Sequence, residues 1–178
     1  MLTKCNPSIM NKFFSNVKIL ILGVSLLPLN SIAQNQSEFW GMTSAGGQYN
    51  AGLIFKTDGS GNNQTVEYNF FQIEGSGPQF TDLIQALDGS LYGMTASGGV
   101  YNYGVIFQYD QSTDTYIKKF DFDGTITGRS PKGSLIQASD GMLYGMTYGG
   151  GANNRGVLFQ FDPVNSIYTK KLDFDGTN

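Results

Sequence analysis

The chain has 178 residues, and its 14 acidic side chains outnumber its 11 basic ones, which gives a net charge of −3 at pH 7. An acidic surface repels phosphate backbones, so nucleic acid is not an expected partner. The chain contains no histidine, which excludes Ser-His-Asp catalysis, Cys-His catalysis and zinc sites built on histidine.

Residues 1–33 predict a signal peptide. Lys12 and Lys18 supply a positive segment, an apolar run follows over 19–29, and small residues then suit cleavage after Ala33. The apolar run is shorter than a membrane-spanning helix, which needs about 20 residues. The alternatives for this segment are a buried helix or an N-terminal anchor.

Cleavage at this position leaves residues 34–38 as a short mature N-terminal segment and removes Cys5, the only cysteine. Because Cys5 precedes the apolar run, it cannot serve as a lipoprotein acylation site. The true start is Met1 or Met10, since the first ten residues fit the signal-peptide pattern poorly. The sequence therefore predicts a protein that is secreted or displayed at the cell surface, with no membrane span in the mature chain.

The rest of the chain, residues 39–178, repeats with a period of 52 residues. Each copy begins with an aromatic–glycine–methionine–threonine segment, continues through a glycine pair and a single glycine, and then carries a short apolar run. The copies span 39–90, 91–142 and 143–178, and the last is incomplete. So many positions in one register predict a tandem array.

The stretch 82–123 illustrates the four β-strands that each period predicts. Residues 82–87 form the first strand, and an Asp-Gly pair then suits a two-residue hairpin turn. Residues 91–95 return antiparallel, and a glycine-rich loop leads to the third and fourth strands at 104–110 and 115–122. Apolar and polar side chains alternate along the last two strands, which predicts a sheet with one partly solvated face.

A four-stranded antiparallel unit of about 50 residues has the size of one β-propeller blade. Such a unit cannot bury both faces alone, so it must stack on copies of itself. The predicted fold class is all-β: tandem four-stranded antiparallel blades that form a partial β-propeller of about 2.75 blades. Closed propellers typically use four to eight blades. Further blades are therefore expected from additional C-terminal sequence or from other chains.

The repeated residues resemble the GloVer-type tandem repeat of secreted bacterial proteins. The resemblance rests on LYGMT at 91–95 and 143–147, on the glycines and apolar runs that follow, and on LIQASDG at 135–141. It covers essentially all of 39–178, and it implies a propeller-like array on exported proteins, often upstream of a cell-surface anchor or sorting segment. Kelch repeats share the length and the double glycine, but they repeat a tryptophan that this chain has only at Trp40.

The loop between the second and third strands of each copy is the strongest binding candidate. It carries tyrosine, asparagine and arginine side chains: Tyr49, Asn50, Tyr101, Asn102, Tyr103, Asn153, Asn154 and Arg155. On one rim of a propeller, tyrosine rings and asparagine amides would offer sugars or peptides an apolar surface beside hydrogen-bonding groups. The alternative is that the glycines fix the loop and the polar residues only keep it soluble.

Acidic residues are the other candidates for chemistry. Asp121 and Asp123 could bind Ca²⁺ through carboxylate oxygens, but the first copy lacks both, which favours a solvated strand end and turn. A catalytic site on identical repeats should appear as an exception to the repeat. Glu67 and Glu74 are peculiar to the first copy and are the candidates for polysaccharide hydrolysis, which needs two carboxylates at one bond. The sequence predicts no metal, no cofactor and no assigned catalytic residue.

These features favour a non-enzymatic binding or interaction scaffold, secreted or at the cell surface, with a glycan or a protein or peptide as partner. One alternative is an extracellular hydrolase or lyase that acts on polysaccharide from the same scaffold. Another is a spacer that displays a different domain.

Overall fold

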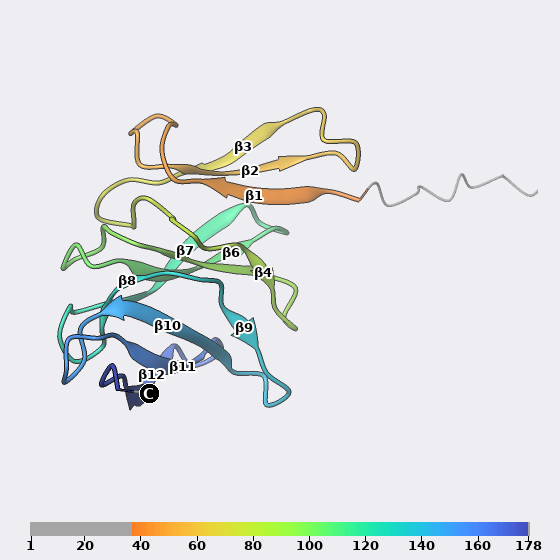
Figure 1. Cartoon of the computed structure of the whole chain (residues 1–178). Helices are drawn as coiled ribbons and strands as arrows, with labels where there is room; N and C mark the ends of the chain where they lie inside the picture. The colour runs from red at the N-terminus through yellow and green to blue at the C-terminus, as the bar shows by residue number, and fades with distance from the viewer. Residues whose placement is uncertain (1–36, 178) are drawn as a thin grey trace, which may run out of the picture. The chain divides into compact units, whose positions relative to one another are not determined.

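A computed structural model describes residues 37–177, so the signal peptide predicted over 1–33 lies outside the described residues. Twelve β-strands occupy the described range and form three antiparallel sheets, one for each copy of the repeat (Figure 1). The described residues contain no helix, and hence none that is long and apolar enough to cross a membrane. The all-β class predicted from the sequence is confirmed.

The sheets follow the order of the copies along the chain. The first sheet contains β1 (Phe39–Thr43), β2 (Leu53–Thr57) and β3 (Thr65–Asn69) in that order. The second contains β4 (Ile84–Gln85), β5 (Leu91–Thr95), β6 (Val105–Asp110) and β7 (Thr115–Asp121). The third contains β8 (Arg129–Pro131), β9 (Ile136–Gln137), β10 (Leu143–Gly149), β11 (Val157–Asp162) and β12 (Ile167–Asp173), with β8 and β9 both paired to β10.

Three of the four strands predicted over 82–123 agree with the structure within one residue, whereas the first, predicted over 82–87, is only the two residues of β4. The backbone amides at the two ends of this segment donate hydrogen bonds outside their own sheet. The amide of Asp82 donates to the Ser134 hydroxyl, and the amide of Leu87 donates to the Gln137 side chain, both in the stretch that carries β8 and β9 of the third sheet. Hydrogen bonds to the neighbouring copy therefore replace the sheet ladder at both ends of this segment.

The linker between copies joins neighbouring sheets. β8 pairs with the end of β10 in the third sheet, while the amide of Ser130 donates to the carbonyl of Tyr103 in the second copy. The preceding linker has the same arrangement, with a bridge between Ser76 and Ser97 and a bond from the amide of Gly77 back to the first copy. Each linker thus lies between two sheets and is hydrogen-bonded to both.

The core lies between successive sheets. We call the side of a sheet that packs on the next copy its forward face, and the opposite side its rear face. The forward face of the second sheet and the rear face of the third form one buried cluster, whose main members are Tyr92, Met94, Ile106, Phe122, Leu143, Phe159 and Phe161. The first and second sheets form an equivalent cluster that includes Ile54, Phe70, Val105, Phe107 and Tyr109. Each described sheet needs a neighbour to bury its apolar side chains.

The same aromatic contact recurs at both interfaces. Tyr68 stacks on Tyr116 with ring centroids 4.0 Å apart, and Phe120 stacks on Tyr168 at 4.4 Å. The hydroxyl groups of Tyr116 and Tyr168 each donate to a backbone carbonyl of the linker that enters their own sheet. The 52-residue spacing therefore reproduces a packing contact as well as a strand order.

Buried tyrosines make the stability of this fold sensitive to alkali. Burial raises the pKa of Tyr109 to about 12 from 10.0, and burial together with the charge of Glu74 raises that of Tyr68 to about 12. A phenol whose pKa is higher in the folded state contributes stability below pH 10. That contribution is lost as the pH rises through the folded value. We expect the thermal unfolding midpoint to fall steadily above about pH 10.

Ionised carboxylates determine how the stability of the fold decreases in acid. Hydrogen bonds from Lys170 and from the amide of Ala152 hold the pKa of Asp173 below 3.8, so its contribution is present above that pH and is lost in acid. The chain has no histidine to titrate in between. Circular dichroism melts from pH 3 to 12 should show a plateau between about pH 5 and pH 9. A clear transition inside that plateau would contradict this account.

Candidate functional site

The loops predicted to bind a ligand share one conformation. Asn50, Asn102 and Asn154 have positive φ angles of 53°, 61° and 55°. The side-chain oxygen of each accepts a hydrogen bond from the amide of the glycine four residues earlier, at 3.0 to 3.2 Å. Asparagine tolerates this left-handed conformation and can bond its own loop. These three side chains therefore build the loop, and a role in ligand binding stays a prediction.

The remaining predicted loop residues do not meet in one cavity. Tyr49 and Tyr101 are each 56% exposed, and the Tyr49 ring lies 5.8 Å from that of Phe71. Tyr103 and Arg155 each lie against the glycine that follows the last strand of their own sheet. The side chain of Asn153 donates to a backbone carbonyl after β12. All these contacts lie within single copies.

The acidic candidates from the sequence have structural partners. Asp121 accepts a hydrogen bond from the amide of Val100 at 2.7 Å and pairs with Lys118 at 3.2 Å, and Asp173 is bonded in the same way in the third copy. Asp123 accepts two amide hydrogen bonds within its own turn. Between residues 37 and 177, no group of three or more acidic, cysteine or histidine side chains is placed to hold a metal ion.

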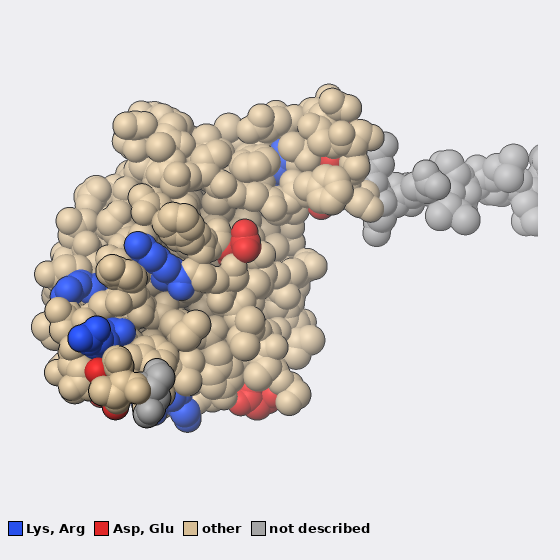
Figure 2. All heavy atoms as spheres, viewed as in Figure 1, with Lys and Arg blue, Asp and Glu red and all other residues tan. Residues whose placement is uncertain are grey.

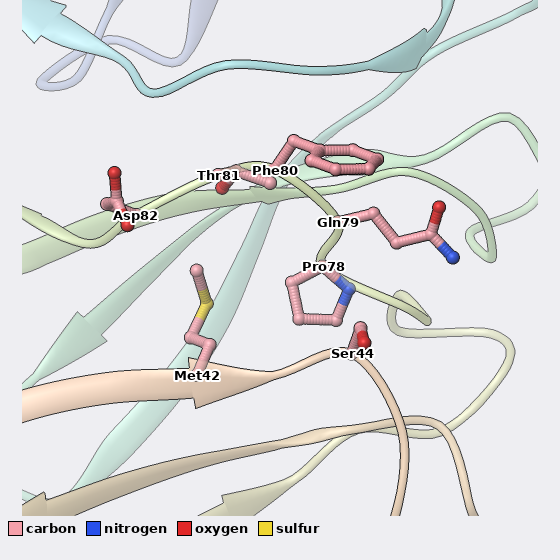
Figure 3. A pocket seen from close by; sticks show the side chains of 7 residues that line it. All are labelled: Met42, Ser44, Pro78, Gln79, Phe80, Thr81 and Asp82. Atoms are coloured by element: carbon pink, nitrogen blue, oxygen red, sulfur yellow. The ribbon is translucent and has the colours of Figure 1, made fainter.

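A pocket of about 700 Å³ lies between the end of β1 and the linker to the second sheet (Figure 3). Met42 and Ser44 line it from the first sheet, and the linker residues from Pro78 to Asp82 line it from the other side. None of the eight predicted loop residues lines this pocket, and neither does Glu67 or Glu74.

Beside this pocket, three side chains form what we call the aromatic–lysine platform: Phe80, Lys132 and Tyr148. The Lys132 ammonium lies 5.6 Å from the centre of the Phe80 ring and 4.3 Å from that of Tyr148, within the range of cation–π attraction. Phe80 is 78% exposed and Tyr148 is 70% exposed, so both rings are open to solvent. The face in Figure 2 is largely uncharged, with most of its basic side chains toward the lower left of the view.

The platform is held by bonds between two linkers. The amide of Gly133 donates to the carbonyl of Phe80 at 2.6 Å, and the hydroxyl of Ser134 donates to the Asp82 carboxylate at 2.7 Å. Phe80 and Lys132 come from successive linkers, and Tyr148 comes from β10. Three segments that are distant in the sequence are therefore fixed side by side.

The two aromatic residues of the platform differ from their equivalents in the other copies. Pro78 and Pro131 contact equivalent glycines in successive copies, so Phe80 occupies the position of Gly133, two residues after the proline. Phe80 has a φ of 56°, which is a strained conformation for a bulky residue, whereas Gly133 adopts its φ of 89° freely. Tyr148 stands where the other copies have serine and alanine. Strained backbone of this kind clusters at functional sites.

The family model described as the Gloeobacter/Verrucomicrobia repeat matches residues 25–178. The match begins inside the segment predicted as the signal peptide and continues through all three copies. A comparison with curated proteins finds no significant match. The resemblance to the GloVer-type repeat is confirmed over most of the chain, and the chain belongs to the Gloeobacter/Verrucomicrobia repeat family.

Proposed function

We propose that this chain is an exported binding scaffold, secreted or held at the cell surface, in which the three sheets are blades of a propeller. Its aromatic–lysine platform binds a polysaccharide that carries carboxylate or sulfate groups. The observation that carries the proposal is the pair of exposed rings that both contact Lys132, at positions whose equivalents are glycine for Phe80 and serine or alanine for Tyr148.

The chemistry of the platform suits an anionic sugar. Open aromatic faces stack on the apolar faces of sugar rings, and an ammonium group between them attracts a carboxylate or a sulfate. Gln79, Thr81 and Asp82 in the adjoining pocket offer donors and acceptors for sugar hydroxyls. A regular scaffold with one irregular polar and aromatic site is typical of a binding module.

Hydrolysis of the same polymer is less well supported. A glycosidase needs two carboxylates that flank one bond, and Asp82 is the one acidic residue among those that line the pocket. Glu67 lies on β3 and pairs with Lys56 at 3.8 Å. The described acids therefore favour binding over turnover.

Replacing Tyr148 with alanine is expected to weaken binding to polygalacturonate or chondroitin sulfate at least tenfold, which corresponds to about 1.4 kcal/mol. Lys132→Gln should weaken it similarly and should flatten its dependence on salt, because the charge contribution is screened. Titration calorimetry measures both effects, with neutral dextran as the comparison polymer. Tyr101→Ala is the matched control, since it removes another exposed tyrosine that does not belong to the platform.

Phe80→Gly separates binding from stability. Glycine is the residue that the repeat has at this position, and it relieves a left-handed conformation that costs a bulky residue about 1–2 kcal/mol. Thermal stability should therefore be unchanged or higher, while affinity falls as it does for Tyr148→Ala. Failure of all the acidic polymers to bind, or binding that survives both substitutions, would remove the proposal.

A further inference from the structure

The forward face of the third sheet has no covering sheet among the described residues. Met146 is 50% exposed, although its equivalent Met94 is completely buried against the third copy. Leu172 is 51% exposed, whereas its equivalent Phe120 packs against the core between the second and third sheets. Ile136, also on this face, is 64% exposed. An apolar face of this kind marks an interaction surface, because the equivalent face of the second sheet is buried against another sheet.

The two internal interfaces show what covers a forward face in this molecule. Phe70 meets Phe107 across the first interface with ring centroids 5.3 Å apart, and Phe122 meets Phe159 across the second at 5.5 Å. The partner is in each case a phenylalanine on the rear face of the next sheet, lying flat against a glycine of its own sheet. Phe174 occupies the position in the third copy that Phe70 and Phe122 occupy in the first two, and it is half-buried.

The rear face of the first sheet presents the matching surface. The Phe55 ring lies against Gly41 as the Phe107 ring lies against Gly93, but Phe55 is only half-buried and Phe107 is completely buried. Phe39, at the position of a leucine in the other copies, is 57% exposed. The described sheets therefore present an open forward face on the third sheet and an open rear face of the same type on the first.

The stacked aromatic pair of the internal interfaces has been replaced at both ends. Tyr116 and Tyr168, which stack on the preceding sheet, have Gln64 as their equivalent in the first copy. The forward partner in the third copy is Leu172 instead of an aromatic residue. A joint between the two open faces keeps the contact between Phe174 and Phe55 and lacks the stack, so it is weaker than the internal interfaces.

We propose that the forward face of the third sheet docks on the rear face of the first sheet of a second copy of this chain. The contact joins two different surfaces, so it either closes a ring or continues as a filament. Two copies of the three described sheets make six, which lies within the roughly four to eight blades of closed propellers, whereas three copies exceed that range. The expected assembly is a closed head-to-tail dimer with two identical joints; this closure rests on the propeller arrangement proposed above.

Sedimentation velocity of the full chain, without any polysaccharide, tests this assembly independently of glycan binding. The wild-type chain should sediment at twice the mass of one chain and dissociate on dilution. Met146→Glu on the forward face and Phe39→Glu on the rear face should each sediment as a folded monomer at concentrations where the wild type is dimeric. Val164→Glu is the control, because Val164 is 81% exposed in the turn between β11 and β12.

Mixing the two monomeric variants distinguishes the geometry. Met146→Glu retains its rear face and Phe39→Glu retains its forward face, so together they should regain one joint and form a heterodimer. A wild-type chain that stays monomeric at all concentrations overturns the proposal. A Phe39→Glu dimer also overturns it, since it would show two forward faces pairing with each other. Open polymers overturn the closed ring.

Discussion

The Phe107→Ala variant is expected to lose about 3–5 kcal/mol of unfolding free energy, the range for large aromatic side chains removed from a packed core. Phe107 is completely buried between the first and second sheets. Its ring is 5.3 Å from Phe70 across the interface and stacks on Tyr116 at 5.2 Å. Truncation removes both contacts and leaves a cavity that two relatively rigid sheets cannot close. Urea unfolding followed by circular dichroism measures the loss.

Phe55→Ala is the matched control, because it makes the same chemical change at the equivalent position of the first sheet. Phe55 is half-buried and has no preceding sheet among the described residues. Its truncation should cost about 1–2 kcal/mol when the chain is measured at concentrations where it is monomeric. An equal loss in the two variants would contradict the placement of Phe107 between sheets. A Phe55→Ala loss that grows with protein concentration would add support for the head-to-tail joint.

Much of the fold was predictable because the 52-residue repeat and the strand pattern within each copy mark the same segments as β-strands. Residues 91–95 were predicted as a strand and form β5 with those bounds, and all five residues are buried because both faces of the second sheet are covered. β8 was not predicted. It is three residues long and contains Pro131, which a strand pattern rejects, and it pairs only because the linker runs beside the end of β10.

The candidate site was less accessible to sequence reasoning. At the 52-residue spacing, Phe80 aligns with Lys132 and its equivalence to Gly133 is hidden. The contacts of Pro78 and Pro131 show that the linkers are offset by one residue. Tyr148 was the one residue of the platform that the sequence could have singled out, because the other copies have serine and alanine at its position. That departure alone could not reveal that Lys132 lies against its ring, since the contact joins different copies.

The loop residues predicted for binding show what recurrence within the repeat indicates. Asn50, Asn102 and Asn154 recur at the same spacing, and a residue that recurs in every copy is best explained by what every copy must build. The structure gives each of them the same positive φ and the same bond to a glycine amide. The recurring asparagines therefore indicate how the loop is built. The aromatic–lysine platform instead contains residues that differ from their equivalents in the other copies.

Replacing Gly104 with alanine is expected to cost at least about 3 kcal/mol, or to prevent folding. Gly104 has a φ of 99°, and a Cβ atom there would overlap the carbonyl oxygen of Thr95 and lie 2.8 Å from Cδ of Pro131. Neither neighbour can rotate away, because one is strand backbone and the other is a proline ring of the next linker. Moving Gly104 would also strain the bond that its carbonyl accepts from the amide of Phe122 at 3.1 Å.

Gly89→Ala isolates the part of this loss that comes from backbone conformation. Gly89 has a similar φ of 83° in the β4–β5 turn, but no atom lies within 4 Å of the Cβ that alanine would add. This variant should lose only about 1 kcal/mol, the cost of a left-handed alanine. Thermal and urea unfolding of the two variants therefore measure the close approach of strand, loop and linker at Gly104. Equal losses in both would mean that the linker of the next copy does not pack against this glycine, and the inferred junction between successive sheets would have to be abandoned.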